Sequence, residues 1–470
     1  MNYEKTLKDA KKDFEERIIP GLEEFIRIDN LSPEFDPEWE TNGKAEKAGM
    51  HLINWAKSQG IKGLKAELIK EPGKTHLILI EIESQGIDKT ILLYGHFDKQ
   101  PALGEWNEGL HPNKPVIKDG KLYGRGASDD GYALFAMIEA VKLIQMQNGK
   151  HSRIVITLES GEESGSPDLV PYLKKLNNRI GNPDLMICMD SGCKDYSSLW
   201  LTTSLRGGMN FELEIECLKE STHSGNSGVA PDSFTVLRIL LDRLDDSKSS
   251  KVKAPLNVEI PQNRIEDAKK LAEYQKEKVV TDSVNLKEGV KPLSEDYKEL
   301  ILNNTWRPTV VVIGMTGVPP AECAGNILRH KTKVKIHIRL PPTFDCKEAE
   351  KVITELLTKD PPFNSIINVK INVSLNGWAA KDMNKSLKKS FTESAKFLFK
   401  NDYYNCGEGG SIPLIPELAE LYPKCEILVT GVLGPGSNAH CPNECLNLDY
   451  TNKMIVALSH VIYDFSNNVE

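Results

Sequence analysis

The stretch Ile91-Leu92-Leu93-Tyr94-Gly95-His96-Phe97-Asp98 decides the fold, because an apolar run with strand character delivers a histidine and an aspartate at its carboxyl end. Two later apolar runs also lead into acids: 154–158 precedes Glu162-Glu163, and 184–189 precedes Asp190. Runs of this length without polar alternation are typical of strands buried on both faces of a parallel sheet. Open parallel sheets bind ligands just beyond the carboxyl ends of their strands. We therefore expect these side chains to meet on one rim.

Composition narrows the functional classes. The chain has 470 residues, 40% of them hydrophobic, which is enough for two or three domains with their own cores. A formal net charge of -8, without a long basic run, argues against nucleic-acid and membrane partners and favours a small-molecule partner. Residues 1–17 are densely charged and lack the apolar core of a signal peptide or spanning helix. A cytoplasmic protein is the resulting expectation.

The nine cysteines are an odd number and form no Cys-x-x-Cys pair, so we expect reduced thiols rather than a disulfide framework or a zinc ribbon. Cys441 and Cys445 lie close to His440 in the sequence. We interpret both as bystanders, because a thiolate metal site normally needs further paired ligands.

Helix and strand signals alternate over the first two hundred residues. A helix is predicted over 131–141, directly after Asp129-Asp130, where aspartate is a favoured N-cap. The next strand follows at Ile154. This alternation predicts an α/β fold with a doubly wound, mostly parallel sheet covered by helices.

From about Gly207 the apolar residues alternate with period two, at 211–216 and 333–340, which indicates half-exposed antiparallel strands. Amphipathic helices are expected over 232–242 and 347–357. These elements predict a smaller α+β, ferredoxin-like domain, and the charged stretch 245–302, helical in parts, is interpreted as an insertion in it.

After Trp378 we expect a long helical segment, a strand at 426–430 and a last helix over 452–465. The second domain therefore interrupts the first. The predicted parts are a catalytic domain over 1–206 and 378–470, and a lid and dimerisation domain over 207–377.

The predicted rim has too many acidic residues for all of them to stay ionised without a bound cation. Close packing of Asp98, Asp129, Glu162-Glu163 and Asp190 would push several carboxylates toward protonation unless cations are bound. Histidine and carboxylate ligands suit zinc, manganese or cobalt, and a shared carboxylate can hold two ions close together. Singly, a His-x-Asp pair or a Glu-Glu pair is usually a solvated surface feature. Their occurrence together at three strand ends favours a metal site.

Six motifs follow one another along the chain, at residues 96–101, 123–131, 159–166, 222–225, 408–413 and 438–444. Together they resemble the M20 family of dinuclear metallopeptidases, and most closely its cytosolic dipeptidase branch, which includes the carnosine dipeptidases. The resemblance covers nearly the whole chain except the 245–302 region.

The resemblance implies two divalent metal ions per subunit, with zinc expected and manganese or cobalt as alternatives. One ion would be held by His96, Asp129 and Asp190, and the other by Asp129, Glu163 and His440, so that Asp129 bridges them.

The resemblance also implies the catalytic roles. Asp98 would orient the His96 imidazole, and Glu162 would be the general base for attack by a metal-bridging hydroxide on the scissile carbonyl. His223 would stabilise the oxyanion. In related enzymes this histidine reaches the active site of the partner subunit, which implies a homodimer formed through the second domains.

Substrate recognition is assigned to residues of the second domain and of a Gly-rich turn. Arg339 is suited to gripping a terminal carboxylate, Asn326 matches a family position that touches substrate, and Ser411 would complete the carboxylate site. Glu408 is a candidate for reading a free amine. The sequence departs from the family where Gly131 directly follows Asp130 and where Ile-Leu-Arg follows Asn326, which leaves the preferred side chains open.

We conclude from the sequence that the chain is a dinuclear-metal hydrolase that cleaves the amide bond of dipeptides or short peptides with a free C-terminal carboxylate. An N-acyl amino-acid deacylase of the same family is the alternative. A catalytically silent binding protein is a third interpretation, but the presence of Glu162 and of every proposed ligand argues against it.

Overall fold

The chain forms two compact units in a computed structural model that describes residues 1–253 and 255–467. The first unit holds residues 1–202, 380–405 and the described residues from 417 onward. The second holds the described residues of 203–379 together with 406–416. The second unit thus interrupts the first in sequence, and a short later segment that carries Ser411 also belongs to it.

A mixed sheet forms the centre of the first unit, with the strand order β1-β2-β6-β3-β7-β17-β8. The inner strands β6, β3, β7 and β17 run parallel, whereas β1, β2 and β8 are attached antiparallel. The strands are β1 (Leu64–Ile69), β2 (Leu77–Ile82), β3 (Thr90–His96), β6 (Arg153–Glu159), β7 (Leu185–Cys188), β8 (Leu199–Leu205) and β17 (Glu426–Val429). The predicted α/β class and the four predicted strands of this sheet are confirmed.

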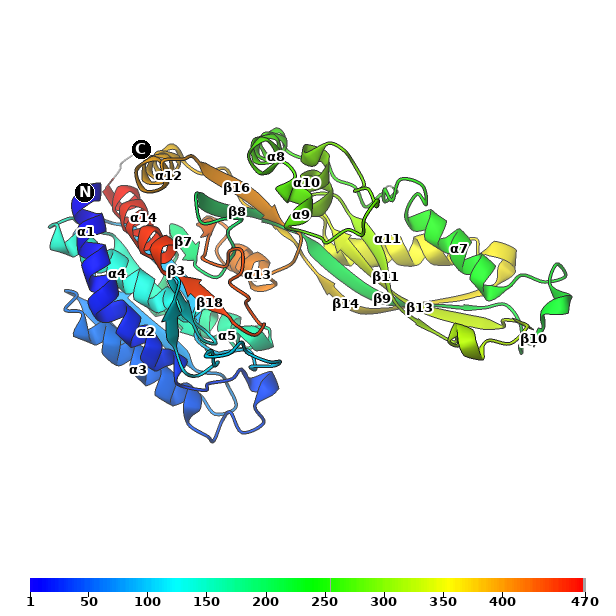
Figure 1. The fold of residues 1–470 in the computed structure, drawn as a ribbon, viewed down its shortest axis with the longest axis horizontal. Helices are drawn as coiled ribbons and strands as arrows, with labels where there is room; N and C mark the ends of the chain where they lie inside the picture. The colour runs from blue at the N-terminus through cyan, green and yellow to red at the C-terminus, as the bar shows by residue number, and fades with distance from the viewer. Residues whose placement is uncertain (254, 468–470) are drawn as a thin grey trace. The chain divides into compact units, whose positions relative to one another are not determined.

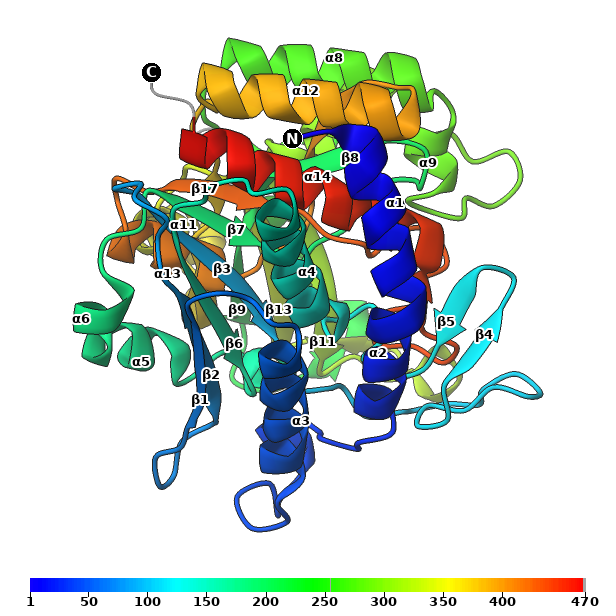
Figure 2. The same ribbon diagram turned by 90° about the vertical axis from the view of Figure 1, so that its left-hand side faces the viewer.

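Helices cover both faces of this sheet, which explains why its inner strands carry no polar alternation. Every residue of β3 and β6 after the first is buried. Helices α1, α3, α4 and α14 lie on one face, and α5 and α13 lie on the other (Figure 1, Figure 2). The helices of this unit are α1 (Tyr3–Asp13), α2 (Ile19–Ile26), α3 (Lys44–Ser58), α4 (Tyr132–Met146), α5 (Leu169–Lys175), α6 (Asn177–Ile180), α12 (Lys385–Phe399), α13 (Leu414–Leu421) and α14 (Leu448–Asn467).

The start of α4 differs from the prediction. Gly131 occupies the N-cap position and no side chain caps the helix. The carboxylate of Asp130 instead accepts a hydrogen bond from the backbone N–H of His96, with an N···O distance of 3.2 Å. A Cβ at Gly131 would collide with the backbone oxygen of Gly126. The close turn before α4 therefore requires a glycine directly after Asp130.

The second unit contains a four-stranded antiparallel sheet in the order β11-β13-β9-β14. Residues on β9 and β13 alternate between buried and partly exposed, as the period-two pattern predicts. Helices α7 and α11 pack with the buried side chains in one apolar core, which includes Phe211, Ile336 and Ile353. The elements are β9 (Gly207–Glu216), β11 (Thr309–Thr316), β13 (Lys331–Leu340), β14 (Ile366–Leu375), α7 (Ser233–Leu244) and α11 (Cys346–Thr358).

The charged stretch 245–302 that we interpreted as an insertion contains α8 (Gln262–Gln275), α9 (Lys278–Thr281) and most of α10 (Tyr297–Thr305), which ends three residues beyond the expected boundary. Short strands complete the chain: β4 (Val116–Lys118), β5 (Lys121–Tyr123), β10 (Thr222–His223), β12 (Ile327–Leu328), β15 (Trp378–Ala379), β16 (Tyr403–Glu408) and β18 (Cys445–Asn447). Among the described residues, no helix is long and apolar enough to cross a membrane.

Candidate metal centre

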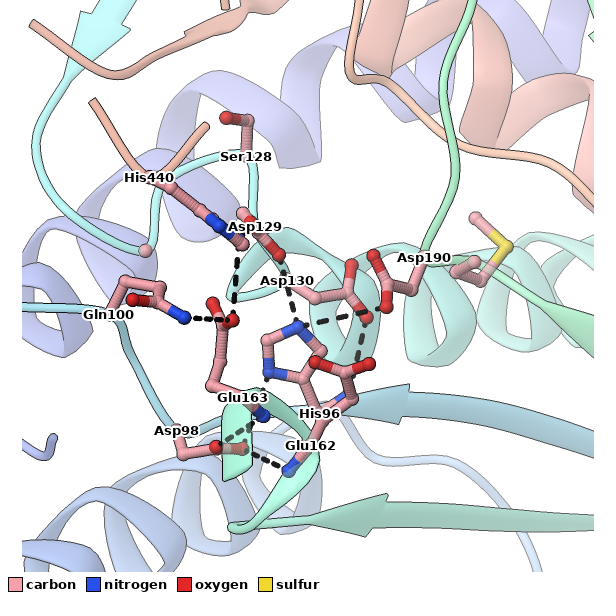
Figure 3. A network of polar contacts seen from close by, with 12 residues as sticks. His96, Asp98, Gln100, Ser128, Asp129, Asp130, Glu162, Glu163, Asp190 and His440 are labelled. Atoms are coloured by element: carbon pink, nitrogen blue, oxygen red, sulfur yellow. Dashed lines mark hydrogen bonds and ion pairs between the residues drawn. The ribbon is translucent and has the colours of Figure 1, made fainter. Parts of the chain in front are cut away.

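The acidic residues predicted to converge lie together at the carboxyl ends of the parallel strands (Figure 3). His96 ends β3, Glu163 lies in a 3₁₀ turn just after β6, and Asp190 follows β7. Asp129 comes from the loop before α4, and His440 comes from the loop before β18. We call the side chains at this edge the acidic rim; they are His96, Asp98, Asp129, Glu162, Glu163, Asp190 and His440.

Asp129 lies between two imidazoles. Its Oδ1 is 3.1 Å from Nε2 of His96, and its Oδ2 is 2.9 Å from Nε2 of His440. Glu163 Oε2 lies 3.2 Å from His440 Nε2, and Asp190 Oδ2 lies 3.9 Å from His96 Nε2. Two potential metal-binding groups result, His96-Asp129-Asp190 and Asp129-Glu163-His440, and they share only Asp129.

The raised pKa values of residues in the acidic rim are those expected of a site that binds cations. Burial, together with the carboxylates of Asp129 and Glu163, raises the pKa of Asp190 to about 7. Hydrogen bonds to Asp129 and Glu163 raise the pKa of His440 to about 10. Burial opposes a charge on His96, but hydrogen bonds to Asp129 and Asp98 raise its pKa well above the usual value. Protons therefore compensate the crowded acids, and divalent cations, which favour ionised carboxylates and neutral imidazoles, would displace them.

Asp98 lies close to both His96 and the Glu162-Glu163 turn of the acidic rim. Its Oδ1 lies 3.4 Å from Nδ1 of His96, on the ring edge opposite Asp129. Its carboxylate also accepts hydrogen bonds from the backbone N–H groups of Glu162 and Glu163, at 3.2 and 3.0 Å. Asp98 is thus placed to orient the imidazole and the Glu162-Glu163 turn together.

The Glu162 carboxylate remains available for chemistry. Its side chain extends toward Asp190 (Figure 3), and none of the described side chains forms an ion pair or hydrogen bond with it. Burial, followed by repulsion from Asp190, raises its pKa well above the ordinary value. A carboxylate in this position can accept and return a proton at neutral pH once cations offset the neighbouring negative charge.

Three residues that sequence reasoning left without a role support the rim. The Gln100 amide donates to Glu163 Oε2 at 2.8 Å. The fully buried Glu444 carboxylate accepts hydrogen bonds from Arg125 Nη1 at 2.6 Å and from the backbone N–H groups of Gly126, Ser128 and Asp129. Glu444 thereby fixes the loop that carries Asp129 to the segment that carries His440. All three residues, Gln100, Arg125 and Glu444, lie inside the quoted motifs, but their partners come from distant segments.

The residues assigned to substrate binding lie in the second unit as two separate pairs. His223 on β10 pairs with Ile327 on β12, and the backbone oxygen of Asn326 accepts from the N–H of Ser224 at 3.0 Å. Arg339 Nη1 donates to Ser411 Oγ at 3.3 Å. The length of strand β13 separates the two pairs. Strand β12 ends three residues before Lys331, the first residue of β13. Arg339 lies eight residues after Lys331, which corresponds to roughly 26 Å between them along an extended strand.

The pattern of charged residues on β9 and β13 explains why the guanidinium of Arg339 remains available for an anion. Lys331 and Lys333 on β13 form ion pairs with Glu212, Glu214 and Glu216 on β9. Further along, the cross-strand partner of His337 is Asn210, and that of Arg339 is Gly208. Among the residues of β13 on this face, the last one with an acidic cross-strand partner lies two same-face positions before Arg339. No carboxylate of the described residues forms an ion pair with Arg339.

The cysteines are free thiols. Cys445 is buried and Cys441 is exposed, and neither belongs to the two potential metal-binding groups of the described residues. The interpretation of these thiols as bystanders to the metal site stays a prediction.

The chain is similar to known peptidases. Residues 92–464 match the model of Peptidase family M20/M25/M40. The chain is 27% identical over 442 residues to the cysteinylglycine-S-conjugate dipeptidase of Corynebacterium striatum, covering 92% of each chain. It is 29% identical over 392 residues to the Cys-Gly metallodipeptidase DUG1 of Saccharomyces cerevisiae, covering 79% of this chain and 78% of the relative. Human carnosine dipeptidase 1 has the same fold, with a TM-score of 0.70, 22% identity and 98% coverage of both chains.

Proposed function

The chain belongs to Peptidase family M20/M25/M40 and is a hydrolase, and on that premise we propose that it cleaves dipeptides or short peptides with a free C-terminal carboxylate. Two of the similar proteins are named as a cysteinylglycine-S-conjugate dipeptidase and a Cys-Gly metallodipeptidase. The observation that carries the proposal is the placement of Asp129, whose two oxygens each face a different imidazole.

The donor set supports a divalent metal cofactor, and we propose two ions per subunit. His96 and Asp190 would hold one ion, Glu163 and His440 the other, and Asp129 would contribute one oxygen to each. Zinc is the metal we expect for imidazole and carboxylate ligands, with manganese and cobalt as alternatives. When bound, such ions would lower the pKa of water and polarise a carbonyl oxygen.

The protein's own groups would then handle the proton. Glu162 would accept the proton of the attacking water and pass it to the amine that leaves, because its carboxylate belongs to the acidic rim but has no partner among the described side chains. Asp98 would keep His96 in one orientation, since it lies beside Nδ1 while Nε2 faces Asp129 and Asp190.

Arg339 and Ser411 would bind the C-terminal carboxylate of the substrate. A guanidinium without an acidic partner, next to a hydroxyl, can form charge-assisted hydrogen bonds with such a group. This site would select peptides with a free C-terminus. It would serve equally for the acyl amino acids of the alternative deacylase reaction.

His223 and Asn326 would act in the active site of a partner subunit. Within one second unit they lie about one strand length away from Arg339 and Ser411, so one ligand of dipeptide size cannot touch both pairs there. Strand β11 lies at an edge of its sheet, and Val311, Ile313 and Met315 on it are exposed. An apolar, unpaired edge suits association with a second copy. We therefore propose a homodimer formed through the second unit. A cytoplasmic location remains a prediction.

The test combines metal analysis with a substrate panel. The purified protein should contain about two divalent ions per subunit and should hydrolyse unmodified dipeptides. N-acetyl amino acids should react much more slowly. Rapid cleavage of N-acetyl amino acids without dipeptide cleavage would establish the deacylase alternative, and no hydrolysis by the fully metallated protein would refute both.

A further inference from the structure

Helix α10 of the charged insertion ends beside the turn that carries Ser411, so the insertion contacts this part of the second unit. The Asn304 side chain lies so close to Gly409 that a Cβ there would be 2.8 Å from the Asn304 Oδ1. A Cβ at Gly407 would be 2.7 Å from Cβ of the buried Thr305. The backbone at Gly407 and Gly409 therefore packs directly on the end of α10.

Arg206 connects these segments. It is 6% exposed, and its Nη1 donates to the backbone oxygens of Asn303 and Arg307, at 3.4 and 3.3 Å, at the carboxyl end of α10. Its Nε donates to the backbone oxygen of Gly409 at 3.1 Å. Its own backbone oxygen accepts a hydrogen bond from Ser411 Oγ at 2.5 Å. One side chain and its backbone thus join the helix, the glycine turn and the serine hydroxyl.

This connection determines the geometry of the Arg339 site. Ser411 Oγ donates to Arg206 and accepts from Arg339, so its position depends on the backbone at Arg206. The two guanidiniums are also close enough to interact: burial, and then the charge of Arg339, lower the pKa of Arg206 to about 10. No described carboxylate forms an ion pair with either arginine. A bound carboxylate would relieve this repulsion.

We propose that Arg206 is a positioning residue through which helix α10 of the insertion holds Ser411 beside Arg339, so that the insertion sets the affinity for the substrate's C-terminal carboxylate. The inference rests on the proposed function for the identity of the ligand. It assigns to the insertion a role in substrate affinity rather than in the chemistry at the acidic rim.

Arg206→Lys tests the geometry separately from the charge, because lysine keeps the positive charge but cannot bridge three carbonyl oxygens in a fork. The KM for a dipeptide should rise about tenfold while kcat stays within about twofold. The KM for the same dipeptide with a C-terminal amide should not change. Because Arg206 acts through Ser411, the double variant Arg206→Lys/Ser411→Ala should raise KM no more than the larger single effect.

A matched pair of core variants tests the insertion itself. Leu302 on α10 is 2% exposed and Leu357 on α11 is fully buried, so each change to alanine should destabilise the unit similarly. Only Leu302→Ala should raise the KM for the free acid. Equal KM changes in both variants would reduce α10 to a general structural element and overturn its positioning role.

Hydrogen–deuterium exchange gives a readout that needs no substrate. In the metal-loaded protein, Arg206→Lys should accelerate exchange in 406–411 while exchange in β9 stays slow. Unchanged exchange in 406–411 would overturn the proposal even if dipeptides are substrates. Faster exchange in a protein that cleaves no peptide would instead support the positioning role and refute the proposed substrate class.

Discussion

The acidic rim of the first unit and the substrate residues of the second unit were assigned from the same kind of motif, yet the structure treats them differently. The five proposed ligands meet around Asp129, although their positions span residues 96 to 440. The four substrate residues form two pairs at opposite ends of β13. The ligand set of the rim is therefore complete within one chain, whereas the two substrate pairs cannot contact one small ligand within a single second unit.

The strand directions explain the difference. In β6, β3, β7 and β17 all carboxyl ends lie at the same edge, so residues just after different strands must be neighbours. In the antiparallel sheet, the start of one strand lies beside the end of the next, and residues that follow different strands are separated by a strand length. Residues at opposite ends of such a strand can serve one small-molecule site only with help from elsewhere, for example from a second copy.

The largest effect should come from the rim. Glu162→Gln should retain the metal but reduce kcat by about a thousandfold or more, because an amide cannot take up the proton of water. The adjacent Glu163→Gln provides the control: it should bind less metal, since it removes a charged donor of one group. Metal analysis and steady-state kinetics on both variants distinguish the roles. An almost fully active Glu162→Gln protein would contradict the general-base assignment.

Subunit mixing tests whether the second pair acts in the partner. His223→Ala alone should lower kcat about a hundredfold through loss of an oxyanion donor. When Glu162→Gln and His223→Ala proteins are unfolded and reassembled together, half of the dimers are mixed, and one of the two sites in each mixed dimer is intact. Activity should recover to about a quarter of the wild-type value. Failure of mixed dimers to recover, despite proven subunit exchange, would place His223 in its own subunit's site.

The ladder of ion pairs on β13 provides a sharper contrast within the second unit. Arg339→Met should raise the KM for a free dipeptide by roughly tenfold to a hundredfold, because a charge-assisted contact to the carboxylate is lost. Lys333 lies on the same face of β13, six residues before Arg339, and its charge is already paired with Glu212 at 2.7 Å. Lys333→Met should therefore leave the KM unchanged. Similar KM values for Arg339→Met and the wild type would remove Arg339 from the substrate site.

A buried acid away from the rim gives the smallest effect. Burial raises the pKa of Glu139 on α4 to about 8, so the folded protein holds a proton that the unfolded chain releases above about pH 4.5. This group therefore lowers stability as the pH rises toward 8. Glu139→Gln does not titrate, and its stability relative to wild type should increase by about 1–3 kcal/mol between pH 5 and pH 8. Denaturant unfolding at both pH values measures the change, and a pH-independent difference would contradict the raised pKa.

The sequence by itself determined the α/β class, the inner strands and the rim residues that follow those strands, because uninterrupted apolar runs specify buried parallel strands and their ends share one edge. The role of His440, which lies on a loop before β18, came only from the resemblance to a known family. It also predicted the half-exposed strands of the second unit from their period-two pattern. Such periodic signals are local, and a single strand or helix contains all of the information.

Only the tertiary structure decided which polar groups support the site. Lys99 follows Asp98 in the motif, where a lysine is normally expected in solvent, but it is buried and donates to the backbone oxygens of Phe25 and Ile28 at the end of α2. Glu444 and Arg206 are similarly defined by donors and acceptors from segments remote in sequence. A buried charge needs several partners at once, and those partners become neighbours only when the units fold.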